Sequence, residues 1–222
     1  MNAVQPVYEG RNLVQIYGGR TALSIGAFAV LPGEVVCLAG PNGCGKSTLL
    51  RILALLERPA SGTLAVHGLA GRSDVTLLLQ EPYLLKMSVY ANVVLGLRLR
   101  RRMEGARDAY EQAMRDAGFK HPADFAQRSP AELSGGERQR IALASRLILK
   151  PKVLLLDEPT ASVDAQSARA VAQAVLKAQS QGATVVCATH DPALARATGA
   201  RTIHLGRAWD EDDPASAPQP SA

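Results

Sequence analysis

A glycine-rich segment early in the chain has the composition of a phosphate-binding loop. It consists of Gly40, Pro41, Asn42, Gly43, Cys44, Gly45, Lys46, Ser47 and Thr48. Its spacing fits G-x-x-x-x-G-K-S/T, in which glycines let the backbone wrap around phosphate oxygens and the following helix points its N–H groups at the anion. We expect Lys46 to reach the β- and γ-phosphates of a nucleotide and the Ser47 hydroxyl to bind Mg²⁺. A chance glycine turn is the alternative, and the strand and helix predicted on either side disfavour it.

Two adjacent carboxylates, Asp157 and Glu158, follow the apolar run Val153–Leu156. The run predicts a buried strand, and ligands of open α/β sheets bind beyond the carboxyl ends of the strands. We expect Asp157 to hold Mg²⁺, directly or through water, and Glu158 to orient and polarise the attacking water. The two acids could instead form a solvated strand edge, but the unbroken apolar run before them and Pro159 directly after them favour the catalytic interpretation.

Short apolar segments alternate with helical patterns along the chain, which is typical of strand–helix–strand units around a parallel sheet. Strands are predicted at 35–39, 62–67, 75–79, 153–157, 184–188 and 202–205. Helices are predicted at 46–56, 88–101, 104–117, 136–149 and 165–180. Both chemical motifs therefore lie at the carboxyl ends of predicted strands, where such sheets bind ligands.

Composition restricts the class of protein. Apolar residues make up 47% of the 222 residues, which is a globular composition. The longest uncharged, mostly apolar run, Thr21–Gly33, is shorter than the roughly 20 residues of a spanning helix, and no secretory signal is visible. Three cysteines without a Cys-x-x-Cys pair suit a reducing cytosol. Part of the net charge of +5 lies in Arg98 and Arg100–Arg102, which we interpret as a solvated helix end rather than a nucleic-acid or lipid patch. No nucleic-acid partner is expected.

The segment Leu133–Arg140, which reads Leu-Ser-Gly-Gly-Glu-Arg-Gln-Arg, resembles the signature sequence of ATP-binding cassette (ABC) ATPases. A serine and two glycines that open a helix form a second anion-binding terminus, and one triphosphate does not need two of these in one chain. The resemblance implies a head-to-tail homodimer that encloses ATP between the loop of one chain and Ser134, Gly135 and Gly136 of the other. These residues would act in trans, as an arginine finger from a partner does.

Four further positions match the family one by one. Gln80 occupies the place of the glutamine that senses Mg²⁺ and water, and Asp164 lies in the loop that crosses the dimer interface. His190 matches the histidine that contacts the γ-phosphate and supports Glu158, and Tyr17 matches the aromatic residue that stacks on adenine. Taken alone, Tyr17 would be an ordinary core residue and His190 a hydrogen-bonded loop histidine. The expected catalytic residues are Glu158, His190, Lys46 and Gln80, and those expected at Mg²⁺ are Ser47, Gln80 and Asp157.

Cys44 lies inside the loop, next to the start of a predicted helix. A helix N-terminus favours the thiolate form of a cysteine. We therefore expect a bulky thiol reagent to modify Cys44 and to block ATP hydrolysis, with MgATP giving protection. The alternative is a small residue that only fits a tight turn.

The resemblance extends over about residues 13–207 and implies the fold. It is α/β, a RecA-like P-loop NTPase core with a small antiparallel β subdomain and an inserted α-helical subdomain. Residues 1–207 would form the cassette, with the helical insertion at about 86–140, and the acidic, Pro-, Ala- and Ser-rich residues 208–222 are expected to be disordered. One departure is the segment 144–146, which reads Ala-Ser-Arg where Ala-Arg-Ala is typical of the family.

A single cassette without a predicted span implies an ATPase that uses ATP and Mg²⁺ and works with integral membrane permease subunits on separate chains. Gln80–Val93 is similar to the importer pattern, in which this segment receives a coupling helix of the permease. An importer also implies a substrate-binding protein, a location at the cytoplasmic face of the inner membrane and, from the resemblance, tungstate or a related oxyanion as solute. Two alternatives stay open: a lipoprotein-release or efflux system, which Glu57–Gly62 resembles equally well, and a soluble non-transport ATPase.

Overall fold

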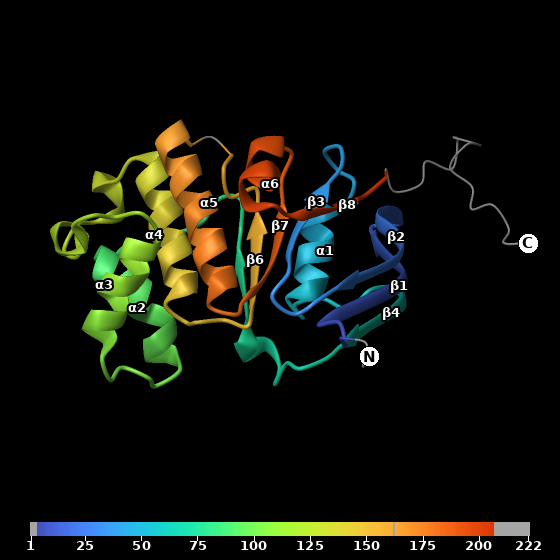
Figure 1. The fold of residues 1–222 in the computed structure, drawn as a ribbon, viewed down its shortest axis with the longest axis horizontal. Helices are drawn as coiled ribbons and strands as arrows, with labels where there is room; N and C mark the ends of the chain where they lie inside the picture. Colours follow the sequence, from blue (N-terminus) through green and yellow to red (C-terminus); the bar gives the residue numbers. More distant parts are fainter. Residues whose placement is uncertain (1–3, 162, 207–222) are drawn as a thin grey trace, which may run out of the picture.

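Five parallel strands form the central layer of the protein, in the order β5-β6-β7-β3-β8 (Figure 1). The computed structural model describes residues 4–161 and 163–206. The strands of this sheet are β3 (Val35–Ala39), β5 (Val75–Leu78), β6 (Val153–Asp157), β7 (Thr184–Ala188) and β8 (Arg201–His204). Because helices cover both faces, every residue of β6 and β7 is buried, which explains their continuous apolar sequences.

Helices on the two faces of the parallel sheet form two separate cores. On one face lies α1 (Lys46–Leu53), whose Leu49, Leu50 and Leu53 pack with the side chains of β3 and β6. On the other face lie α4 (Gly135–Leu147), α5 (Ala165–Ser180) and α6 (Pro192–Thr198). The sheet is thus fixed from both sides, and the segments that follow its strands emerge at one edge.

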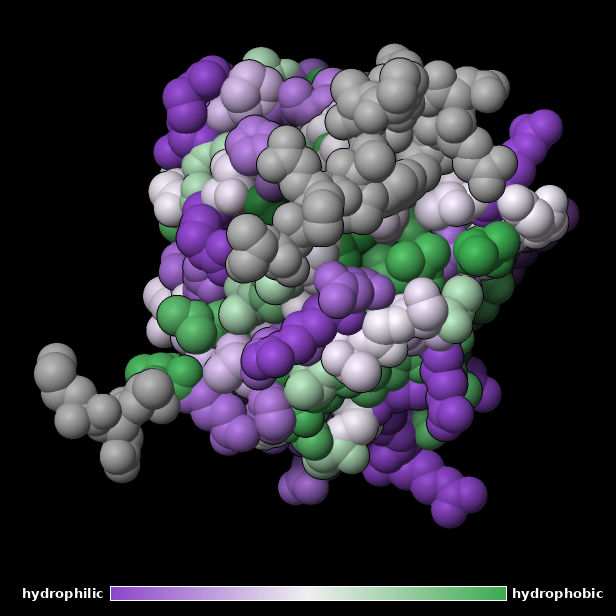
Figure 2. Space-filling view, turned by 90° about the vertical axis from the view of Figure 1, so that its right-hand side faces the viewer, coloured by the Kyte–Doolittle hydropathy of each residue, from purple (hydrophilic) through white to green (hydrophobic). Residues whose placement is uncertain are grey.

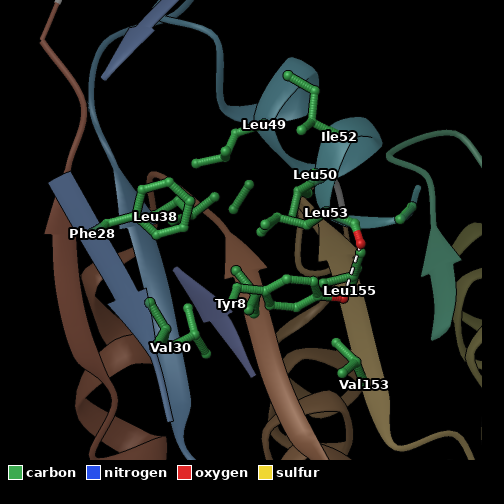
Figure 3. Close-up of a cluster of buried hydrophobic side chains, with 14 of the residues drawn as sticks. Tyr8, Phe28, Val30, Leu38, Leu49, Leu50, Ile52, Leu53, Val153 and Leu155 are labelled. Carbon is green, nitrogen blue, oxygen red and sulfur yellow. Dashed lines mark hydrogen bonds between the residues drawn. The ribbon is translucent and has the colours of Figure 1, made fainter. Parts of the chain in front are cut away.

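A second, antiparallel sheet packs on the far side of α1 in the order β2-β1-β4. Its strands are β1 (Tyr8–Tyr17), β2 (Arg20–Val30) and β4 (Ser61–Val66). The side chain of Tyr8 is completely buried in the core between this sheet and α1, where its hydroxyl donates a hydrogen bond of 2.8 Å to the Leu53 carbonyl oxygen (Figure 3). The outward side of this region mixes hydrophilic and hydrophobic side chains (Figure 2). Ile16 and Leu31 are exposed apolar residues of this part of the chain.

Between β5 and β6 the chain forms a helical layer that stands beside α4 and α5 in Figure 1. Helices α2 (Val89–Leu99) and α3 (Ala106–Asp116) pack on α4 around Val93, Tyr110 and Met114, and short 3₁₀ turns at 122–125 and 130–132 lead into α4. In the part of the chain that the structure describes, no helix is both long enough and apolar enough to cross a bilayer.

Most of the predicted elements lie where the sequence places them, and the differences have local causes. The predicted bounds 35–39, 153–157, 165–180 and 184–188 are those observed. Helix α1 ends three residues before the predicted position 56, because Leu55 adopts a left-handed backbone with φ 57°. Helix α3 begins after Gly105, not at Glu104, because that glycine has φ 63°. Helix α6 was not predicted, and the acidic tail 208–222 lies outside the described residues.

Candidate active site

A pocket of about 500 Å³ opens beyond the carboxyl ends of β3, β5, β6 and β7, and it gathers most of the predicted site residues. It is lined by Tyr17, Ala22, Asn42, Gly43, Gly45, Lys46, Ser47, Thr48, Arg51, Gln80, Asp157, Glu158 and His190. A larger concavity of about 710 Å³ lies between α3 and the ends of α4 and α5. Three acidic residues, Glu104, Asp108 and Asp116, line that concavity against one basic residue, Lys150, so it suits a phosphate ligand less well.

The glycine-rich loop joins β3 to α1 and needs its glycines for space as well as for conformation. Gly40 has φ 155°, and a Cβ there would lie 2.5 Å from the Leu205 carbonyl oxygen. Gly45 has φ 98°, caps α1, and would bring a Cβ equally close to the Ala22 carbonyl oxygen. The buried Lys46 opens α1, and its Nζ donates to the carbonyl oxygens of Gly40 and Pro41 at 2.8 and 3.1 Å. The loop therefore places the ammonium group of Lys46 and the N-terminus of α1 beside its own curved backbone, which is an anion-binding arrangement.

The side chain of Cys44 does not face this pocket. Only 1% of the residue is exposed, and its Sγ would lie 2.7 Å from a Cβ added to Gly40. This burial disfavours the expected modification of Cys44 by a bulky thiol reagent. Cys44 fills space beneath the loop, and only its backbone can face an anion.

Asp157 ends β6 with a buried carboxylate, which makes it a strong candidate for a cation ligand. Burial raises the pKa of Asp157, a hydrogen bond with Ser47 lowers it, and the nearby carboxylate of Glu158 raises it again, so that the pKa lies above its usual value. Its Oδ1 is buried and has no hydrogen-bond partner among the described residues. A carboxylate oxygen without a donor, beside a serine hydroxyl, fits Mg²⁺, which takes one or two carboxylates together with substrate phosphates.

Glu158 lies on the turn after β6 in a left-handed backbone conformation with φ 45°. Its backbone N–H donates 2.8 Å to the Ala188 carbonyl oxygen, which fixes the turn to the end of β7. Its Oε2 accepts a hydrogen bond of 3.3 Å from the backbone N–H of His190 and lies 2.9 Å from His190 Nδ1. The backbone N–H and ring of His190 thus both contact one oxygen of a buried carboxylate.

Tyr17 and Gln80 both line the pocket with exposed side chains. Gln80 follows β5 directly, whereas Tyr17 comes from the end of β1 in the antiparallel sheet. Two further residues were missed by the sequence analysis: Arg51, which lines the pocket, and Glu57, which binds both Arg51 and Tyr17. A signal was present, because Arg51 follows Thr48 at the helical spacing of three residues and shares its face of α1.

Ser134, Gly135, Gly136 and Asp164 do not line this pocket. Ser134 caps α4, accepting from the Glu137 N–H at 3.2 Å while Glu137 accepts from the Ser134 N–H at 2.8 Å. A Cβ on Gly136 would lie 2.9 Å from Asp164 Oδ2, so the start of α4 packs tightly on the start of α5. The start of α4 therefore lies outside the pocket of its own chain.

Comparison with known proteins agrees with this geometry. A family model described as ABC transporter matches residues 24–161. The chain is 39% identical to the Fe(3+) ions import ATP-binding protein FbpC 1 of Rhizobium meliloti (strain 1021), an alignment that covers 87% of this chain and 56% of the relative. It is 37% identical to a probable anion import ATP-binding protein of Haloferax volcanii, in an alignment that covers 93% of this chain and 80% of that relative. The chain thus spans about half the length of the iron-import relatives that it matches.

A third relative, the phosphate import ATP-binding protein PstB 2 of Natronomonas pharaonis, is 36% identical, with 85% of this chain and 73% of the relative covered. Among solved structures, a dimeric post-hydrolysis state of the ATP-binding cassette MJ0796 bound to ADP and Pi is similar. Its TM-score is 0.80 at 29% identity, with 89% of this chain and 94% of the other chain covered. The fold is that of these cassettes, an α/β fold with one antiparallel and one parallel sheet.

Proposed function

Because the chain belongs to the ABC transporter family, we propose that it binds and hydrolyses ATP as the energy-supplying subunit of a solute importer. The observation that carries the proposal is one pocket in which a phosphate-binding loop faces Asp157, Glu158 and His190. The ammonium group of Lys46, the N-terminus of α1 and the buried carboxylate of Asp157, whose Oδ1 has no hydrogen-bond partner among the described residues, meet there, as phosphoryl transfer requires.

In the proposed reaction the loop N–H groups and Lys46 bind the β- and γ-phosphates, and Lys46 exchanges its bonds with loop carbonyls for bonds with the anion. Ser47, Asp157 and Gln80 would hold Mg²⁺, which neutralises phosphate charge. Glu158 accepts a proton from the attacking water as the water adds to the γ-phosphorus and the bond from that phosphorus to the β,γ-bridging oxygen breaks, which releases ADP and inorganic phosphate. His190 keeps the Glu158 carboxylate in place through its backbone N–H and ring.

Two chains would complete each site. Support comes from the N-terminus of α4, which has the serine and glycines of an anion site yet lies outside the pocket of its own chain. Ser134, Gly135 and Gly136 of one chain would meet the γ-phosphate held by the other, with Asp164 beside them. The similar MJ0796 cassettes are dimeric.

The membrane-embedded partner would be a permease made of separate subunits, with the chain bound peripherally to it at the cytoplasmic face of the inner membrane. Large apolar side chains are exposed after β5, with Tyr83 78% exposed and Leu79 and Leu85 also at the surface. Such a group of side chains suits a protein contact. A substrate-binding protein would act through the permease and not on this chain directly.

For the solute we propose an oxyanion such as tungstate or phosphate, which is supported by the names of the anion- and phosphate-import relatives. The iron-import relatives name the alternative, Fe³⁺. Uptake of labelled oxyanions and of Fe³⁺ into vesicles that contain the chain and its co-purified permease separates the two. Export of solute from such vesicles would contradict the importer assignment.

Phosphate release from MgATP tests the enzymatic part. We expect turnover by the wild-type chain, none above background by Lys46→Ala, and wild-type turnover by Lys120→Ala, which removes an exposed lysine elsewhere. Equal turnover by the first variant and the wild type would refute the assignment of the loop.

A further inference from the structure

One edge of the pocket is built by three side chains that bind one another: Tyr17, Arg51 and Glu57. The Tyr17 hydroxyl donates a hydrogen bond to Glu57 Oε2. Arg51 donates from Nε to Glu57 Oε1 at 2.7 Å, and its terminal nitrogen lies 3.4 Å from the Tyr17 oxygen. The guanidinium carbon is 5.9 Å from the centre of the tyrosine ring. Each of the three residues therefore contacts the other two.

This triad is connected to the phosphate-binding loop and to the antiparallel sheet. Arg51 also donates to Thr48 Oγ1 at 3.2 Å, in the first turn of α1. The Gln15 side chain lies 3.5 Å from Glu57 Oε2 and accepts a hydrogen bond of 2.8 Å from the Ala60 N–H. The hydroxyl of Tyr17 is thus attached to a network that joins the antiparallel sheet to α1.

Such an attachment matters because Tyr17 is 42% exposed and ends a strand just before two glycines with positive φ. An exposed ring at a strand end has little packing to select one rotamer, and ordering it upon ligand binding would oppose binding entropically. A hydrogen bond to a carboxylate is stronger than one between neutral groups, so Glu57 can hold the ring before the ligand arrives.

We propose that Glu57 and Arg51 are positioning residues that hold the ring of Tyr17 flat for stacking on the base of the nucleotide. The proposal rests on the proposed function, because the pocket must bind a nucleotide for the ring to have a base to stack on. Glu57 acts on the hydroxyl, and Arg51 fixes the carboxylate of Glu57 from the side of α1. Glu57 does not line the pocket, so its removal should act on affinity and not on chemistry.

The test compares Tyr17→Phe, which keeps the ring and removes its anchor, with Glu57→Ala, which removes the anchoring acid. We expect each to raise the KM for MgATP about 3- to 10-fold, the worth of one hydrogen bond, at unchanged kcat. The double variant should be no weaker than either single variant, because both remove the same constraint. Glu9→Ala, which removes an exposed ion pair with Arg11 on the same strand, serves as control.

Inorganic tripolyphosphate separates positioning of the ring from damage to the loop, because it carries the phosphates without a base. Its inhibition constant should be the same for the wild type and both variants. A parallel loss of affinity for tripolyphosphate would overturn the proposal, as would a wild-type KM in Tyr17→Phe. Tyr17→Phe also covers the case in which Glu57→Ala fails to fold. A wild-type chain that binds neither ATP nor tripolyphosphate would instead contradict the proposed function itself.

Discussion

Replacement of Glu158 by glutamine isolates the chemical step from nucleotide binding. The change keeps the length of the side chain, and its amide oxygen can still accept from the backbone N–H of His190, as Oε2 does at 3.3 Å. Glutamine also tolerates the left-handed backbone at position 158 no worse than glutamate does, since both carry a Cβ. Only the proton-accepting carboxylate is lost.

General-base catalysis contributes about 10²- to 10⁴-fold, so kcat should fall by that factor, or about 3 to 5.5 kcal/mol in activation free energy. The affinity of the variant for MgATP should stay within about threefold of the wild-type affinity, because Lys46 and the phosphate-binding loop are unchanged. Single-turnover phosphate release measures the first quantity and displacement of a fluorescent ATP analogue the second. A kcat within tenfold of the wild type would remove Glu158 from the mechanism, and Glu111→Gln, which breaks an exposed pair with Arg115, controls for loss of a carboxylate.

The same variant should accumulate as an ATP-dependent homodimer, since ligand bound between two chains drives association by mass action. Light scattering with and without MgATP measures this. Adding Ser134→Arg should abolish the dimer, because a bulky cation replaces the residue that caps α4. Ser134→Ala is the matched control, because it also removes the cap but adds no bulk. A dimer that survives Ser134→Arg would place the interface elsewhere.

Three further results are expected from the buried groups of the fold. In a variant whose other cysteines are replaced by serine, Cys44 should react with a thiol reagent far more slowly in the native protein than in denaturant; equal rates would show that the loop opens freely. Tyr8→Phe should lower the free energy of unfolding by about 1 to 2 kcal/mol in urea titration, because the Leu53 carbonyl loses its donor. Burial raises the pKa of Glu34, but hydrogen bonds from Arg201 and the Leu31 N–H together lower it by more, so the pKa lies below its usual value. Glu34→Gln should therefore cost less than about 1 kcal/mol at pH 7 and nothing once the pH falls below the folded pKa, and a loss that is the same at all pH values would refute this.

The central strands β3, β6 and β7 of the parallel sheet could be predicted from sequence because they are buried on both faces and read as continuous apolar runs bounded by turns. In the antiparallel sheet, β4 lies within one residue of the predicted strand 62–67, but β1 and β2 were not predicted. β1 is irregular at two points, with register shifts after Arg11 and Gln15 and a left-handed Asn12, so its buried residues do not alternate regularly. Helix α6 was missed although Asp191, Pro192 and Gly199 are start and stop signals, because a helix of 7 residues, about two turns, is too short to show a periodic apolar pattern.

Within the site, the residues that follow strands could be predicted because chain order and strand order determine where they lie. The partners of Tyr17 could not, since Glu57 lies 40 positions away and meets it only after β1 packs beside α1. Cys44 was misjudged for a related reason: a motif fixes the path of the loop backbone, but not which side chains turn inward beneath it. Distances such as the 2.7 Å between Cys44 Sγ and a Cβ on Gly40 appear only in the folded loop.

The left-handed conformation of Glu158 sets folding stability against activity. A residue with a Cβ adopts that conformation at a cost of about 1 to 2 kcal/mol, which glycine avoids. Glu158 also repels the buried Asp157, which contributes to the raised pKa of that residue. Glu158→Gly should therefore melt at a higher temperature than the wild type in calorimetry while losing turnover, and a lower melting temperature would show that the contacts of Glu158 with His190 outweigh the strain. Selecting variants of this protein for thermal stability alone would then remove the carboxylate proposed to activate water. A screen for more stable variants therefore has to measure ATP hydrolysis as well as the melting temperature.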